Sequence, residues 1–309
     1  MTFCPKSAKK RGMDVWESIV LGIVEGLTEY LPVSSTGHLI IAQHLLGVED
    51  SEAVTAYEIC IQGGAILAVL GLYSPRVMQM CRGLWWGLGR LLQGRRGGAR
   101  EGQESGAESH AAGLRLLVNL ILGFLPAAVV GLSCSRYIKA YLFNAPTVMA
   151  AWALGGVVIL LYVRQREKSG QGQRGKALEE LSPRGALGIG VMQCVAMCPG
   201  VSRSLMTMLG GLTVGLSVSA AVEYSFLLGL ITLGAATCHD AVKHGAEMLQ
   251  HIGWLPIVVG TLVAWGSALV AVKWMVGYLN RHSLAIFGWY RLAAAGLMLV
   301  LILRGFVIR

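Results

Sequence analysis

Glu25-Gly-Leu-Thr-Glu-Tyr-Leu-Pro-Val-Ser-Ser-Thr-Gly-His38 is a stretch of acids, hydroxyl groups and a histidine that lies between two apolar segments, 19–24 and 39–46. Groups of this kind are normally solvated. At the depth of a bilayer an ionisable side chain is costly and usually serves a function. The stretch is therefore the first candidate for a site, and it predicts a site enclosed by apolar helices.

The composition of the whole chain predicts a membrane protein. Hydrophobic residues make up 54% of its 309 residues, charged residues make up only 14%, and the mean hydropathy is +0.60. A membrane-spanning helix needs about 20 mainly apolar residues. Windows of this kind lie near 53–72, 114–133, 146–163, 205–238, 254–272 and 284–303.

The net charge of +9 predicts orientation rather than nucleic-acid binding, because the basic residues lie between the apolar runs. Two basic stretches, 74–113 and 164–184, are expected in the cytoplasm. The first is interpreted as a basic, glycine-rich loop with a flexible linker at 93–110. The basic residues at the start of the chain are interpreted as a retained tail, and the seven cysteines imply no disulfide framework.

A proline inside the opening stretch predicts a re-entrant hairpin. Pro32 should end the helix that starts at Val15, since the residue before a proline is pushed out of the α region. Residues 33–37 then form a loop, and the apolar piece at 38–46 is too short to span. Two half-length helices around a polar loop are tolerated at this depth only where they are buried in protein or line a wet cavity.

The two halves of the chain repeat four motifs in the same order. A proline–serine turn is followed by a glutamate with a glycine six positions on, then a leucine–proline pair, then a tyrosine–leucine segment with an asparagine. The first copies are Pro32-Val-Ser-Ser, Glu58 with Gly64, Leu125-Pro, and Tyr141-Leu-Phe-Asn; the second copies are Pro199-Gly-Val-Ser, Glu223 with Gly229, Leu255-Pro, and Tyr278-Leu-Asn.

This repeat predicts an all-α polytopic membrane protein built as an inverted repeat. The first repeat is 1–163, a basic cytoplasmic linker is 164–184, and the second, inverted repeat is 185–309. Each half has one re-entrant helical hairpin and about three transmembrane helices, and an odd number of crossings inverts the second copy. Both termini are then outside, although the basic N-terminal tail favours the cytoplasm.

The acids and hydroxyls of the opening stretch predict a metal-assisted or base-assisted site. Glu25 and Glu29 are four residues apart and share a helix face. Paired carboxylates suit a hard cation such as Mg²⁺ or Ca²⁺, or a general base; two solvated surface charges are the alternative. The turn Ser34-Ser-Thr-Gly37 is able to present hydrogen-bond donors to a phosphate, although such a turn is also a common helix cap.

A histidine and an arginine complete the candidate site. His38 is a candidate nucleophile or proton shuttle, with a packing role as the alternative. Arg203, between Ser202 and Ser204 in the second proline turn, has a planar guanidinium that suits phosphate oxygens. The alternative is a structural ion pair with one of the acids in the spans. Brought together, these groups are the parts of a phosphoryl-transfer site.

The segments EGLTEYLPVSSTGH and PGVSRS resemble the two signature motifs of the undecaprenyl-diphosphate phosphatase family, the bacterial bacitracin-resistance phosphatases. The resemblance extends through IQGGAILAV, LPAAVVG, IKAYLFN and EYSFLL, in order, over nearly the whole chain. It implies an inner-membrane enzyme that hydrolyses undecaprenyl diphosphate to undecaprenyl phosphate and inorganic phosphate, and so recycles the carrier lipid for peptidoglycan synthesis.

The resemblance also implies roles for single residues. Glu25 and Glu29 match an acidic pair linked to a divalent cation. Ser35 and His38 match the proposed catalytic residues, and either is a candidate to attack phosphorus. Arg203 matches the phosphate-binding arginine, with Ser34, Thr36, Gly37, Ser202 and Ser204 as further candidate phosphate ligands. The active site is expected to face the periplasm.

The chain departs from the family pattern at Leu205, where a glycine is usual, and at 229–231, which lacks a proline. These departures bear on substrate fit. A flippase for a polyprenyl phosphate is the alternative function, because inverted repeats with polar loops near the bilayer midplane are also transporter architecture. The expected partners are the polyprenyl diphosphate and membrane lipids, with homo-oligomers open and no nucleic acid.

Overall fold

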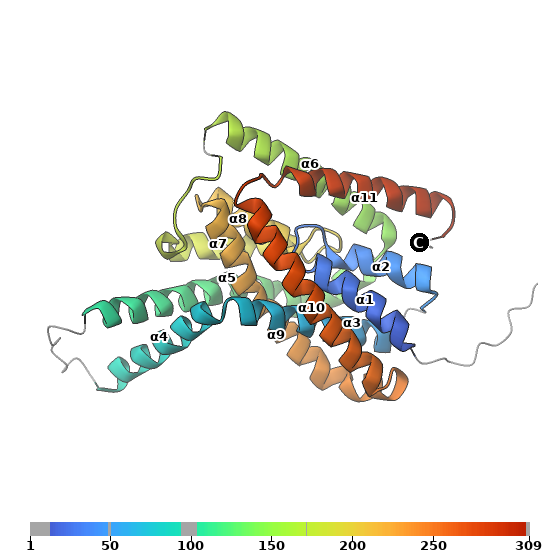
Figure 1. Ribbon diagram of the computed structural model, residues 1–309, viewed down its shortest axis with the longest axis horizontal. Coiled ribbons are helices and arrows are strands. Elements are labelled where there is room, and N and C mark those ends of the chain that lie inside the picture. The colour runs from blue at the N-terminus through green and yellow to red at the C-terminus, as the bar shows by residue number, and fades with distance from the viewer. Residues whose placement is uncertain (1–12, 49–50, 94–103, 171, 307–309) are drawn as a thin grey trace, which may run out of the picture.

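The structure, a computed structural model, describes residues 13–48, 51–93, 104–170 and 172–306. Within these ranges the chain is helical and has no β-strand, and one helical hairpin projects from the body (Figure 1). The helices are α1 (Val15–Thr28), α2 (Ser35–Leu46), α3 (Glu52–Leu72), α4 (Ser74–Gln93), α5 (Glu104–Leu142), α6 (Ala145–Lys168), the 3-10 turn η2 (Leu178–Glu180), α7 (Pro183–Val195), α8 (Arg203–Thr213), α9 (Val218–His251), α10 (Trp254–Leu279) and α11 (Ala285–Leu303).

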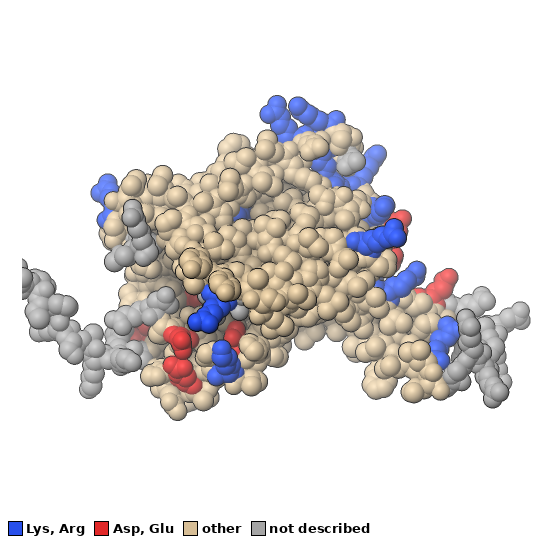
Figure 2. All heavy atoms as spheres, turned by 180° about the vertical axis from the view of Figure 1, so that it is seen from behind, with Lys and Arg blue, Asp and Glu red and all other residues tan. Residues whose placement is uncertain are grey.

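Six of the described helices are long and apolar enough to cross a membrane: α3, α5 over Gly106–Cys134, α6, α9, α10 and α11. The shortest has 19 residues, close to the roughly 20 that a bilayer needs. Figure 2 shows a broad face with almost no charged side chains and charged groups gathered toward its ends. These features confirm the prediction of an all-helical polytopic membrane protein.

The apolar window at 205–238 is not a single span, which corrects the sequence interpretation. Its first part belongs to the short helix α8, and its remainder lies in α9. Between them Gly215 adopts a φ of 94°, which glycine reaches without steric cost. Ser217 then caps α9 by accepting a hydrogen bond from the backbone at 3.2 Å. Turn chemistry, which a hydropathy window does not register, separates the two helices.

The prediction of a loop over 74–113 was wrong for its described part, because 74–93 forms α4 and 104–113 begins α5. The segment 94–103 lies outside the described residues. The glycines that suggested a loop pack the two helices together. A Cβ at Gly83 would lie 2.5 Å from Leu114 N, and one at Gly113 would lie 2.2 Å from Gln79 O.

Four of the α-helices that the structure describes are too short to span a bilayer: α1 and α2 have 14 and 12 residues, and α7 and α8 have 13 and 11. α1 packs on α10, and α7 packs on α5. Both contacts depend on glycine, since a Cβ at Gly22 would lie 2.6 Å from Gly260 O and one at Gly190 would lie 2.5 Å from Gly123 O. The long helices α3 and α9 form a further pair, as do α6 and α11.

Gly22→Ala is expected to lower the free energy of unfolding by about 1–3 kcal/mol, because the added methyl group meets a backbone oxygen that has no room to move. Gly266→Ala on α10 is the matched control, because a Cβ there meets nothing within 4 Å. It should be neutral or stabilising by up to about 1 kcal/mol. Thermal unfolding of the purified proteins in detergent checks this, and equal midpoints for the two variants would contradict the packing argument.

Candidate active site

Two serine turns of the same unusual conformation lie next to the predicted site residues. Ser34, before α2, has φ 70° and ψ 104°, and Ser202, before α8, has φ 78° and ψ 117°. Among the described residues, these two alone have a positive φ without being glycine. Such a conformation costs on the order of 1–3 kcal/mol and is typical of functional sites. Each turn leads directly into the positive end of a helix, which favours anions.

The boundaries of the first turn differ from the sequence prediction. α1 ends at Thr28 rather than near Leu31, and α2 begins at Ser35 rather than at His38. The chain reverses over a short turn in which Val33 N donates to the carbonyl of Leu31 at 2.8 Å. Because Ser34 completes the reversal, the hydroxyl residues after it lie in the first helical turn instead of a loop.

Glu29 joins the two halves of the chain. Its Oε2 accepts a hydrogen bond from Ser35 Oγ at 2.5 Å, and its Oε1 lies 3.3 Å from Arg203 Nη2. Glu29 and Arg203 are 174 positions apart, and their side chains are only 6% and 10% exposed. The structure therefore brings three of the predicted catalytic residues together, and Arg203 makes the ion pair that was its alternative role.

The guanidinium group of Arg203 is closely surrounded. It lies 5.3 Å from the ring centre of Tyr30, and Nη1 donates to the carbonyl of Ser225 at 3.1 Å. Gly229 leaves the necessary room, since a Cβ there would lie 2.5 Å from Nη1. Leu205, one of the departures from the family pattern, is buried in the core. Arg203 Nε is buried without a partner, and an anion oxygen would satisfy it.

Glu25 is the most enclosed acid of the site. Its side chain is 1% exposed, and its Oε1 is buried with no hydrogen-bond partner. Glu29, one turn further along, is also buried. These positions rule out a solvated surface pair. Arg203 already supplies a positive partner for Glu29, whereas Glu25 keeps a buried oxygen without a partner, and hard divalent cations prefer oxygen ligands of this kind. The donor set therefore fits the predicted Mg²⁺ or Ca²⁺.

The imidazole of His38 has both nitrogens engaged. Nδ1 lies 2.7 Å from the carbonyl of Ser34, and Nε2 lies 2.7 Å from the hydroxyl of Tyr290. A carbonyl only accepts, so Nδ1 carries a proton; in the neutral imidazole, Nε2 then accepts from the Tyr290 hydroxyl. The ring also stacks on Tyr290, at 5.6 Å between centres, and contacts Trp152 at 4.9 Å. Sequence reasoning missed Tyr290, which lies inside the apolar window at 284–303.

The remaining predicted phosphate ligands include residues with structural partners. Ser204 Oγ donates to Leu31 O at 2.8 Å and so connects the two turns, and Ser202 Oγ lies 2.9 Å from Ser204 Oγ. Gly37 packs against a ring, since a Cβ there would lie 2.3 Å from Trp152 Cζ2. A phosphate-binding role stays a prediction for Ser34, Thr36, Gly37, Ser202 and Ser204.

Arg291 of α11 is the largest omission of the sequence analysis. It is fully buried and donates to three carbonyls, those of Pro32 at 3.2 Å, Ala151 at 2.8 Å and Gly200 at 2.8 Å. Two of these carbonyls belong to the two proline turns, so one side chain holds both turns in place. An arginine inside the apolar window at 284–303 was the available signal, because an intramembrane charge usually serves a purpose.

Arg291→Met is expected to destabilise the protein by about 3 kcal/mol or more, because it leaves three buried carbonyls unpaired at about 1–3 kcal/mol each. The two proline turns, which contain Pro32 and Gly200, should then no longer be held at a fixed position relative to each other. Arg281→Met, at an exposed position close by in the sequence, is the matched control and should change stability little. Thermal unfolding in detergent measures both variants; an unchanged midpoint for Arg291→Met would show that the carbonyls find other partners.

A second group of possible metal ligands lies away from the predicted pair. Glu52 at the start of α3 and His244 and Glu247 on α9 place ligand atoms within 4.8 Å of one another. Both carboxylates are exposed, and exposed acids of this kind are common without an ion. The buried, partnerless oxygen of Glu25 is the stronger indication of a cation.

Six bilayer-length helices, together with two buried carboxylates and the partly buried Ser35, His38 and Arg203, define a multi-pass membrane protein with a polar site between its helices. The sequence matches the family described as "Bacitracin resistance protein BacA" over residues 18–297. The chain belongs to this family, as its two signature motifs predicted.

Individual relatives are similar over almost their full length. A protein of Chromobacterium violaceum named "Undecaprenyl-diphosphatase 1" is 39% identical, with 90% of this chain and 93% of the relative covered. Proteins named "Undecaprenyl-diphosphatase" from Sorangium cellulosum and Cereibacter sphaeroides are 41% and 37% identical, over 92% and 94% of this chain and 85% and 97% of the relative.

Proposed function

We propose that the protein hydrolyses undecaprenyl diphosphate to undecaprenyl phosphate and inorganic phosphate, and so regenerates the carrier lipid for peptidoglycan synthesis. The names of its relatives support the substrate and the reaction. The observation that carries the chemistry is Glu29, which contacts Ser35 on one oxygen and Arg203 on the other. No relative reported above is named as a transporter, so the flippase alternative has no support.

Ser35 is the proposed nucleophile, and Glu29 is its general base. The Ser35 hydroxyl already donates to Glu29, so the proton passes to the carboxylate as Oγ bonds to the terminal phosphorus. The bond from that phosphorus to the bridging oxygen breaks, and undecaprenyl phosphate leaves. Water then attacks the phosphorus of the phosphoserine, the bond from phosphorus to Oγ breaks, and Glu29 returns the proton to Oγ as inorganic phosphate is released. His38 is less suited to attack, because both ring nitrogens already have hydrogen-bond partners in Ser34 and Tyr290.

Arg203 stabilises the charge that spreads over the transferring phosphoryl group. Its planar, weakly hydrated guanidinium suits phosphate oxygens, and its buried Nε has a hydrogen to donate. A fixed positive group in a dry site costs no reorganisation during the reaction. The positive ends of α2 and α8, entered through the two serine turns, add to the same field.

Glu25 and Glu29 are the proposed ligands of a divalent cation, Mg²⁺ or Ca²⁺. When bound, the cation would neutralise phosphate charge and polarise the phosphoryl oxygens. Glu25 is suited to hold it, because one of its buried oxygens has no other partner.

Chelation with EDTA is expected to abolish phosphate release from a polyprenyl diphosphate, and Mg²⁺ or Ca²⁺ should restore it. The purified protein is assayed in detergent for inorganic phosphate. Cation binding should also raise the midpoint of thermal unfolding, because a ligand that binds only the folded state stabilises it. Glu25→Gln should lose this thermal shift. Full activity in EDTA would contradict the metal, and no phosphate release under any condition would contradict the function.

We further propose that the protein is an inverted repeat in a bacterial inner membrane and that its site faces the periplasm. The matching serine turns and the paired contacts of α1 with α10 and of α7 with α5 support two related halves. Each half has one re-entrant hairpin and three crossings, with the basic stretches in the cytoplasm.

This orientation predicts the result of thiol labelling. A membrane-impermeant thiol reagent on intact cells should label exposed Cys134 and spare exposed Cys81. The reverse would contradict the orientation.

A further inference from the structure

Helix α4 leaves the body of the protein directly after a membrane span. One residue, Tyr73, separates it from α3. It pairs with the first part of α5 in a hairpin that projects at one end of the molecule (Figure 1). Its 20 residues correspond to a length of about 30 Å. Because α3 is a candidate span of 21 residues, about the length that a bilayer needs, we expect α4 to start close to the membrane surface.

The two sides of α4 have different surroundings. The side toward α5 is formed by Met80, which is buried, and by Gly83 and Gly87, where a Cβ would contact residues of α5. Large apolar side chains fill the side turned away from it, and Met78, Trp85, Leu88 and Leu92 recur there at helical spacing. Their exposed fractions are 53%, 75%, 40% and 86%. Leu84 and Leu91 follow Met80 and Gly87 by four positions and so share the side toward α5, although they are 41% and 81% exposed.

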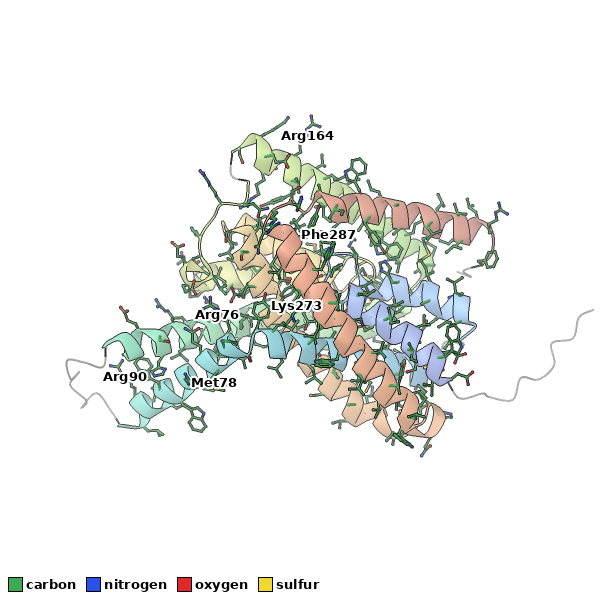
Figure 3. All side chains as sticks on the ribbon, viewed as in Figure 1. Arg76, Met78, Arg90, Arg164, Lys273 and Phe287 are labelled. Carbon is green, nitrogen blue, oxygen red and sulfur yellow. The ribbon has the colours of Figure 1, made fainter. Side chains whose placement is uncertain are left out.

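The charge on α4 is entirely positive. Residues 74–93 contain three arginines and no Asp or Glu. Arg82 and Arg90 are exposed, and Arg90 lies 4.8 Å from the ring centre of Trp86. Arg76 instead points back to the body, where it binds Glu223 at 2.7 Å and Glu179 at 2.9 Å, and so fixes the base of the hairpin. Figure 3 shows Arg76 near the body and Arg90 toward the tip.

We propose that α4 is an interfacial arm that inserts its apolar face into the lipid surface and binds anionic headgroups through Arg82 and Arg90. Exposed Leu and Trp beside Arg, on a helix that starts at the bilayer, are the composition of such a helix. A second copy of the chain is a poorer occupant, because its α4 carries the same uncompensated positive charge. The other basic stretch, 164–184, is expected on the same side of the membrane as α4, the side that carries anionic lipids.

Spin labels on the two sides of α4 test this arm in the full-length protein. The seven cysteines are replaced by alanine, one label is introduced through Leu88→Cys or Arg82→Cys, and the protein is placed in nanodiscs of phosphatidylcholine and phosphatidylglycerol. Oxygen, which partitions into lipid, should relax the label at position 88 at least about twofold more than a water-soluble nickel chelate does. The order should reverse at position 82.

Two further measurements separate the alternatives. Equal access of the nickel chelate to positions 88 and 82 would overturn the proposal in favour of a water-exposed arm, and a label at 88 shielded from both reagents would overturn it in favour of a protein partner.

The contact with anionic headgroups is tested separately. Removing phosphatidylglycerol, or combining Arg82→Gln with Arg90→Gln, should reduce the oxygen preference at 88. No change in either case would overturn the headgroup contact. A label through Leu262→Cys, exposed on α10, should stay lipid-accessible throughout and reports a correctly inserted protein.

Discussion

Ser35→Ala is expected to lower the rate of phosphate release from a polyprenyl diphosphate by about a thousandfold or more, because it removes the attacking oxygen. His38→Gln should cost less, up to about a hundredfold, because the imidazole positions the turn through Ser34 and Tyr290 without reaching phosphorus. Initial rates of phosphate release from the purified proteins compare the two.

Ser169→Ala, at an exposed position after α6, serves as the control for a lost hydroxyl and should keep full activity. The two site variants also need thermal midpoints close to that of the wild type, so that the loss reports chemistry. If His38→Gln were inactive and Ser35→Ala kept a substantial rate, the nucleophile would be His38, and the contact between Ser35 and Glu29 would be structural.

Arg203→Ala is expected to reduce the catalytic rate constant by about a hundredfold to a thousandfold, the usual cost of losing one charge-stabilising donor. Arg203→Lys should recover only a small part of the rate. A lysine keeps the charge, but it lacks the planar fork that lets Arg203 contact Glu29 and Ser225 at the same time. Steady-state kinetics with a polyprenyl diphosphate separate the rate constant from the Michaelis constant.

Arg184→Ala, at an exposed position near the start of α7, is the matched control and should behave as the wild type. The thermal midpoint of Arg203→Ala has to be measured as well, because this variant removes the guanidinium group that pairs with the buried Glu29. If Arg203→Ala kept the rate constant and lost only stability, the arginine would be a structural partner of Glu29, as its ion pair alone would allow.

Errors in the predicted helix boundaries arose where local backbone chemistry outweighed hydropathy. The glycines of 74–113 suggested a flexible loop, yet Gly83 and Gly113 allow α4 and α5 to approach closely. The window at 205–238 read as one span because its turn, centred on Gly215, contains no strongly polar residue. The close contacts at Gly83 and Gly113 and the positive φ at Gly215 decide these boundaries. None of them alters the pattern of apolar residues along the chain, so a hydropathy window does not detect them.

The first half of the candidate site was accessible from the sequence because its parts are close in the chain. Glu25, Glu29, Ser35 and His38 lie within one turn of helix on either side of a short turn, so their proximity follows from local geometry. The repeat then indicated that Arg203 would be added from the second half. Tyr290 was not accessible, because it follows no local motif. Arg291 was visible as a charge inside an apolar window, but its three carbonyl partners depend on tertiary packing and could not be predicted from the sequence.

The sequence by itself determined that this is an all-helical membrane protein of the BacA family, because apolar windows and contiguous motifs are local properties of the chain. Only the tertiary structure decided that Glu29 is shared by Ser35 and Arg203, and that Arg291 reaches across 259 positions to Pro32. Contacts of this range depend on how helices pack. A buried charge does not select its partner by spacing; it takes the partner that packing brings within hydrogen-bond distance.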